Sequence, residues 1–262
     1  MKRTSRSTAI ALMAMFLSVN ACAEDVKVMI SGGFKAALEK LAPEYERRTG
    51  DNIVIIPGPS MGTTPQAIPN RLARGEKADV VIMVGNALAK LEQARLTRPG
   101  TRTELADSRI GMVVKKGADI PDISSETTLR NTLLQARSIA YSDSASGRYV
   151  SEELFKKLGI EKEVTSKATK VERIPVASEV AKGKYAVGFQ QVSELLPIQG
   201  ITFIGKIPDN LQYITRFAGA VTRDAEHPAE GKALLNYLAS PPSREVIRET
   251  GMIPVTSGDT AR

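Results

Sequence analysis

Wholly apolar runs alternate with amphipathic segments along most of this chain, and this alternation restricts the possible folds more than any other feature. Residues 53–56 and 80–83 are entirely apolar, and residues 26–30 are nearly so. Such runs are typical of strands buried on both faces of a sheet. Between the first two runs, apolar residues from Phe34 to Tyr45 recur at helical spacing. The pattern predicts an α/β fold with parallel-rich sheets flanked by helices.

The same alternation continues to the carboxyl end. We expect strands at 110–114, 138–141, 171–174, 186–189, 201–204 and 213–221, and helices at 129–136, 147–158, 177–182, 228–238 and 243–250. Two α/β units fit this length better than one large sheet. We place lobe 1 at residues 24–107 and 217–262 and lobe 2 at residues 108–216, with a cleft between the lobes.

The first 23 residues predict a signal peptide rather than part of the fold. A basic start precedes an apolar run at residues 9–19, and small residues follow at Ala21 and Ala23. We expect cleavage after Ala23 and a periplasmic protein. The alternative is a lipoprotein signal, in which Cys22 is acylated.

The charge balance argues against a nucleic-acid partner. The net charge of +7 includes three cations of the signal segment, without which 33 Lys and Arg face 29 Asp and Glu. No basic block with interleaved aromatic residues occurs, and Trp is absent. One His and one Cys cannot form a structural zinc site. We therefore expect a monomer that binds a small anion and needs neither a metal nor a cofactor.

Three predicted strand-to-helix turns are rich in Ser, Gly and Thr. They contain Ser31, Gly32 and Gly33, then Ser60, Thr63 and Thr64, then Ser144, Ser146 and Gly147. Ligands of open α/β sheets sit beyond the carboxyl ends of the strands, where helix N-terminal N–H groups attract anions. Ordinary helix capping favours the same residue types. Because three such turns occur, we interpret them as an anion site.

Other polar residues follow the strands of lobe 2. Arg173 can bind a carboxylate through two hydrogen bonds, and Gln190 and Gln191 can also donate to an anion. Arg148 is expected to be solvated. The alternative for the two glutamines is helix capping.

A serine hydrolase is a remote alternative. Residues 58–62 match the G-x-S-x-G pattern around Ser60, and His227 follows in the order expected of one hydrolase class. Three prolines crowd this turn, and His227 lies in a segment that reads as a surface loop.

Several segments resemble the type II periplasmic binding proteins, in particular their molybdate-binding-like branch. The matching segments are residues 78–82, 146–149, 157–159, 187–189, 237–241 and 251–252. The resemblance covers nearly the whole chain after the signal segment, and it implies a two-lobed fold with an anion in the cleft. One alternative that it implies is a receptor that delivers molybdate or another oxyanion to an ABC permease.

The departures from that branch favour a larger ligand. Gly33 stands at the position of an oxyanion-binding serine, Gln191 at that of a tyrosine, and Arg173 at a neutral one. The resemblance extends to an isomerase of this fold, which implies allylic proton transfer in an unsaturated tricarboxylate. Such a reaction needs a base. Asp143 and Tyr141, at the end of a lobe 2 strand, are the nearest candidates.

Overall fold

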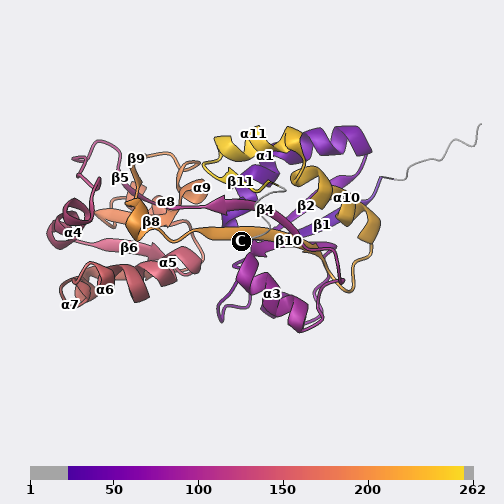
Figure 1. The fold of residues 1–262 in the computed structure, drawn as a ribbon, viewed down its shortest axis with the longest axis horizontal. Coiled ribbons are helices and arrows are strands. Elements are labelled where there is room, and N and C mark those ends of the chain that lie inside the picture. Colours follow the sequence, from indigo (N-terminus) through magenta and orange to yellow (C-terminus); the bar gives the residue numbers. More distant parts are fainter. Residues whose placement is uncertain (1–22, 257–262) are drawn as a thin grey trace, which may run out of the picture.

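Two separate sheets organise the chain (Figure 1). The structure is a computed structural model that describes residues 23–256. The first sheet has the order β11-β4-β10-β3-β1-β2 and the second β7-β6-β8-β5-β9. The first sheet consists of β1 (Asp25–Ile30), β2 (Asn52–Pro57), β3 (Val80–Val84), β4 (Thr103–Ser108), β10 (Thr215–Val221) and β11 (Ile253–Pro254). The second sheet consists of β5 (Ile110–Lys115), β6 (Ile139–Ser142), β7 (Ala168–Val171), β8 (Val187–Gln191) and β9 (Ile201–Lys206).

Helices cover both sheets, so the predicted α/β class is confirmed. The first sheet carries α1 (Gly32–Thr49), α2 (Ile68–Ala73), α3 (Gly85–Gln93), α10 (Pro228–Leu238) and α11 (Arg244–Glu249). The second carries α4 (Glu126–Gln135), α5 (Ala145–Tyr149), a π-helical turn (Val150–Leu154), α6 (Phe155–Lys157), α7 (Glu161–Val164), α8 (Val176–Ala181) and α9 (Val192–Leu195). Short 3-10 turns span Thr165–Lys167, Asp209–Leu211 and Pro241–Ser243. Among residues 23–256, no helix has the length and apolar character that crossing a membrane requires.

The sheets are mixed rather than mainly parallel. Strand β1 pairs in parallel with β2 and β3, whereas β10 runs antiparallel to β3 and β4. In the second sheet β6 is parallel to β7 and β8, and β5 is antiparallel to β8 and β9. The parallel strands of each sheet follow β-α-β connections, which carry their carboxyl ends to one edge.

The chain passes between the sheets twice, and the two passages are tied to each other. It leaves the first sheet after Ser108 and enters the second at Ile110, and it returns before Thr215. The side-chain amide of Gln212 accepts from Ile110 N (3.0 Å) and donates to Ile110 O (2.8 Å). On this basis we propose the lobe boundaries expected above, with the hinge at these passages.

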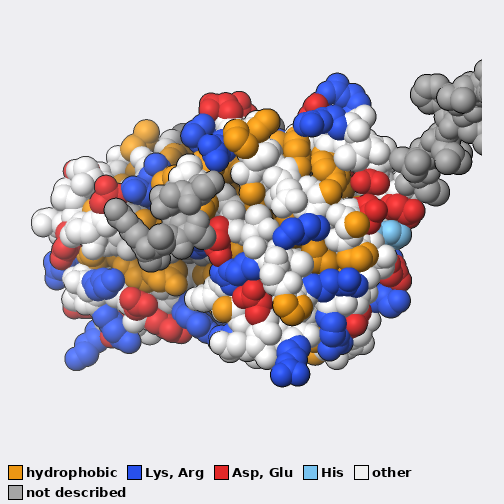
Figure 2. Space-filling view, turned by 45° about the vertical axis from the view of Figure 1, so that its right-hand side comes forward, with side chains coloured by type: hydrophobic (Ala, Val, Ile, Leu, Met, Phe, Trp, Pro, Cys, Tyr) orange, Lys and Arg blue, Asp and Glu red, His pale blue; other side chains and the backbone are white. Residues whose placement is uncertain are grey.

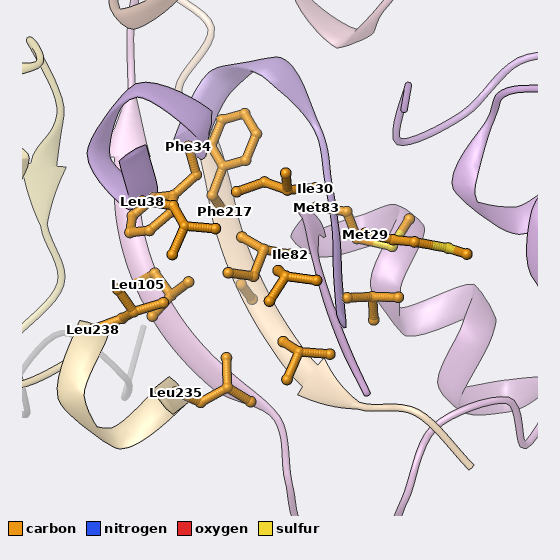
Figure 3. Packing of buried hydrophobic residues seen from close by; sticks show 14 of the residues in the cluster. Met29, Ile30, Phe34, Leu38, Ile82, Met83, Leu105, Phe217, Leu235 and Leu238 are labelled. Carbon is orange, nitrogen blue, oxygen red and sulfur yellow. The ribbon is translucent and has the colours of Figure 1, made fainter. Parts of the chain in front are cut away.

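Each sheet has its own apolar core. In the first, Phe34 and Leu38 of α1 pack with Phe217 of β10, Ile82 of β3 and Leu105 of β4 (Figure 3), and all five side chains are almost fully buried. On the outer surface, Lys and Arg side chains are interspersed with Asp and Glu over the face that Figure 2 shows.

The structure differs from the sequence expectations at three elements, β7, α3 and β4. Strand β7 ends at Val171 rather than at residue 174, and the residues after it form a loop in which Arg173 has φ +66°. Helix α3 and strand β4 were not anticipated. Strand β4 has no continuous apolar run, because Leu105 and Ala106 are its only apolar residues, and only these two and Ser108 are buried.

The turn between β6 and α5 depends on Gly147. A Cβ atom at this position would lie 1.7 Å from the backbone oxygen of Ser142, and no rotamer change can relieve a clash with backbone. We expect Gly147→Ala to lower the free energy of unfolding by about 3 kcal/mol or more. Gly50→Ala is the control: it has φ +84° and open space around it, so it should cost only about 1–2 kcal/mol. Urea unfolding of both variants measures the difference, and equal losses would contradict the proposed clash.

Candidate functional site

A pocket of about 480 Å³ lies between residues of the two sheets, and we call it the cleft. Its wall on the side of the first sheet includes Ser31, Gly32, Gly33, Lys35, Ser60 and Phe217, and its wall on the side of the second includes Asp143, Ser144, Arg173, Gln190, Gln191 and Glu194. This volume is typical of sites for small organic ligands. The carboxyl ends of β1, β2, β3, β6 and β8 all reach it.

The amino terminus of α1 forms one wall of the cleft. Ser31 is the N-cap residue and has extended backbone, but its side chain accepts no hydrogen bond from an N–H group of the helix. Its Oγ is buried without a hydrogen-bond partner. A Cβ atom on Gly33 would lie 2.1 Å from the Phe217 ring, so only glycine fits there. The free N–H groups and the unpartnered hydroxyl suit a carboxylate or oxyanion.

Ser60 lines the same cleft as this helix terminus. Its Oγ accepts a hydrogen bond from Val84 N (2.9 Å), and the residue is 1% exposed. The hydroxyl proton is not engaged by that bond and can be donated to a ligand.

Each wall of the cleft includes one positively charged residue. Lys35, in the first turns of α1, and Arg173, in the loop after β7, both line it. Arg173 has left-handed backbone, which is uncommon for a residue with a Cβ atom. Its N–H donates to Asp143 Oδ2 (3.2 Å). The carboxylate of Asp143 thereby fixes the loop that carries the guanidinium.

The two glutamines at the end of β8 are held by neighbouring groups. Gln190 Oε1 accepts from Val176 N (2.9 Å), the first residue of α8. Gln191 Nε2 donates to Thr215 Oγ1 (2.9 Å), and Gln191 Oε1 is buried without a partner. Both residues line the cleft.

Glu194 is a cleft residue that the sequence analysis missed. It lies on α9, and its Oε1 accepts from Gln190 Nε2 (3.0 Å). Burial raises the pKa of this carboxyl to about 7, and the charge of Asp143 adds to the rise, whereas the hydrogen bond from Gln190 lowers it. A perturbed carboxyl in a cleft marks a candidate for proton transfer.

Helix α9 also joins the two walls. Ser193 Oγ donates to the backbone oxygen of Gly33 (2.6 Å), and both residues are buried. A Cβ atom on Gly32 would lie 2.1 Å from Glu194 Oε1. The absence of a side chain at Gly32 therefore lets the carboxylate rest on the first turn of α1.

The structure does not bring four of the predicted side chains to the cleft. Tyr141 packs edge-on against Phe155 in an apolar core of the second sheet, which also contains Phe189 and Leu154. Ser146 is fully buried, and its Oγ lies 3.0 Å from that of Ser142. Thr63 is exposed, and neither Thr63 nor Thr64 lines the cleft, although Ser60 and Gln66 of the same loop do.

The geometry does not support a serine hydrolase. The β2 strand ends at Pro57 and is followed by a loop instead of the helix that a nucleophile elbow requires. His227 lies outside the cleft, where its Nδ1 is 3.4 Å from Glu24. Ser60 therefore has no histidine base beside it.

The comparisons with known proteins agree with this architecture. A family model described as bacterial extracellular solute-binding protein matches residues 26–253. An aconitate isomerase from Pseudomonas sp is 46% identical over 228 residues, which are 87% of this chain and 87% of that protein. The molybdate-binding protein ModA of Azotobacter vinelandii is 26% identical, over 92% of this chain and 95% of its own.

A solved structure shows the same fold. The periplasmic molybdate-binding protein of Azotobacter vinelandii superposes with a TM-score of 0.72 at 18% identity, covering 88% of this chain and 100% of the other. Together with the family match, this confirms the type II periplasmic-binding-protein fold expected from the sequence.

The raised pKa of Glu194 predicts a pH-dependent stability. Between pH 4.5 and about 7 the folded state holds a proton that the unfolded state has lost, so the free energy of unfolding falls as pH rises. Glu194→Gln removes this penalty. Since the side chain is only partly buried, we expect a gain on the order of 1–2 kcal/mol at pH 8 and little gain at pH 4.5.

Urea unfolding of parent and variant at both pH values measures this difference. Glu152→Gln, a change at an exposed position on the π-helical turn, is the matched control and should have no effect at either pH. A gain that is equal at pH 4.5 and pH 8 would show that the Glu194 carboxyl is not desolvated.

Proposed function

This chain belongs to the bacterial extracellular solute-binding proteins, and we propose that it uses their fold as an enzyme, an aconitate isomerase that interconverts trans- and cis-aconitate. The relative at 46% identity carries that name, and the cleft of this chain has the groups that the reaction needs. The reaction is an allylic proton transfer, which requires charge stabilisation and a base but no redox partner.

Two carboxylates inside an otherwise anion-binding cleft favour an enzyme over a receptor. Asp143 and Glu194 line the same pocket as Arg173, Lys35 and the amino terminus of α1. In a receptor for an inorganic oxyanion, a carboxylate next to the ligand would weaken binding by repulsion. A proton-transfer enzyme needs such a group.

The cleft suits a ligand with several carboxylates. The amino terminus of α1 with Ser31 can hold one, and Arg173 and Lys35 can neutralise others. Neutralising these groups also lowers the energy of the carbanion that forms when the substrate loses a proton. A tetrahedral oxyanion would fill only a small part of about 480 Å³.

The second candidate is a receptor for molybdate or another oxyanion that serves an ABC permease. The relative named as a molybdate-binding protein and the unpartnered Ser31 Oγ beside the α1 terminus support it. For either function we propose a periplasmic monomer. Cys22 and the signal segment before Ala23, on which this location rests, lie outside the described residues.

Turnover and binding distinguish the two candidates. We expect the parent protein to convert trans-aconitate, seen as a change in ultraviolet absorbance, and to bind molybdate weakly in calorimetry. Added aconitate should raise the melting temperature, because it binds the folded state alone. Tight molybdate binding without any turnover would overturn the enzyme and favour the receptor.

Arg173→Gly tests whether the Arg173 guanidinium holds a substrate carboxylate, a role that we call the charge clamp, without straining the backbone. Glycine fits the left-handed conformation at this position, so the change removes only the side chain. Losing a charge-assisted hydrogen bond costs about 1.5–3 kcal/mol, so the dissociation constant for aconitate should rise roughly tenfold to more than a hundredfold.

The chain offers a matched control for this variant. Arg95 is the other non-glycine residue with positive φ among residues 23–256, and it is exposed beyond α3, outside the cleft. Arg95→Gly should leave calorimetric affinity unchanged, as should Arg148→Ala at an exposed position on α5. Affinity lost in a control and kept in Arg173→Gly would assign the clamp to another arginine.

A further inference from the structure

We propose that Glu194 is the catalytic base of the isomerase, and that it takes and returns the substrate proton through Oε2 while Gln190 holds Oε1. The inference rests on the proposed function and names the residue that performs its central step. It replaces Asp143 and Tyr141, the bases considered from the sequence.

The orientation of Gln190 decides which oxygen of Glu194 can carry the proton. Gln190 Oε1 accepts the N–H of Val176, so its NH₂ group faces Glu194 and donates to Oε1. An oxygen that accepts this bond in both protonation states leaves the other oxygen to bind the proton. No residue in the described part of the chain donates to Glu194 Oε2.

Glu194 lies next to the place where a substrate carboxylate is expected. Its Oε1 rests over Gly32, in the first turn of α1, and that turn provides the free N–H groups and the Ser31 hydroxyl of the cleft. A carboxylate bound to these donors has its neighbouring carbon beside Glu194. Removal of a proton from that carbon begins the isomerisation.

The charges around Glu194 suit a base at neutral pH. Asp143, Arg173 and Lys35 are the other charged groups of the cleft wall. Burial and Asp143 bring the pKa of Glu194 to about 7, so at this pH about half of the molecules carry the basic form. A base is most effective when its pKa lies near the working pH.

The proton transfer balances without another reactant. The Glu194 carboxylate accepts a proton from the methylene carbon of aconitate, and the C–H electron pair spreads over the three-carbon allylic unit. The protonated Glu194 then donates to the opposite end of that unit. One C–H bond is broken and one is formed, the double bond moves by one position, and the Glu194 carboxylate is regenerated.

Asp143 is not the base in this proposal, because its carboxylate holds the loop of Arg173. Its Oδ2 accepts the backbone N–H of Arg173, and this contact holds the loop in its left-handed conformation. We assign Asp143 as a positioning residue, so Asp143→Asn should raise KM for aconitate more than it lowers kcat.

Glu194→Gln tests the base, because glutamine imitates the protonated acid but cannot accept the proton. We expect kcat for trans-aconitate to fall by about a hundredfold or more. Calorimetry with trans-aconitate should show an affinity equal to or tighter than that of the parent, since one negative charge is gone. Glu152→Gln, at its exposed position, should keep the parent kcat.

Gly32→Ala provides an independent variant that keeps the acid. The added Cβ atom displaces the Glu194 carboxylate, so we expect kcat to fall by about tenfold or more. In the parent, kcat/KM should decline as pH falls below about 7, because protonation removes the base.

The outcomes separate the base from the function. A parent that converts aconitate with a Glu194→Gln variant that keeps more than about a third of its kcat would overturn Glu194 as the base and leave the isomerase intact. A Glu194→Gln variant that loses affinity together with turnover would make Glu194 a binding residue. A parent without turnover would overturn both proposals.

Discussion

The contact of helix α9 with the first turn of α1 determines the arrangement of the whole cleft. Ser193 Oγ donates to Gly33 O across the two sheets, and Glu194 rests on the bare backbone of Gly32. The same short helix follows directly from Gln190 and Gln191 at the end of β8. The contact therefore holds the Glu194 carboxyl of one lobe against the amino terminus of α1 in the other, and both proposals depend on it.

The sequence predicted the secondary structure well where burial of a strand on both faces requires a continuous run of apolar residues. Runs such as residues 80–83 are buried on both faces, and strand β3 lies there as expected. The loop of Arg173 was misplaced because left-handed backbone is set by the tertiary contact with Asp143, which no local pattern records. Ser146 had the residue type of a ligand donor, but its hydroxyl satisfies a neighbouring serine.

Glu194 shows the limit of sequence reasoning about the site. In the sequence it lies between serine and leucine in a short segment that resembles any surface helix turn. The role that we propose for it rests on three groups that folding brings beside it: the Gly32 backbone, the Gln190 amide and the charge of Asp143. Only the assembled cleft distinguishes this glutamate from the exposed ones. On our proposal, a solute-binding fold has acquired a catalytic base that no sequence motif marks.

The left-handed backbone at Arg173 has an evolutionary consequence. Glycine is the residue that this conformation favours, so replacing the arginine there costs the folded chain little. Every arginine codon is one nucleotide away from a glycine codon. A single nucleotide substitution can therefore remove the positive charge from this wall of the cleft while the loop keeps its backbone conformation. Selection for a neutral or smaller solute would have a short genetic path to follow at this position, and the reverse change would restore the charge as directly.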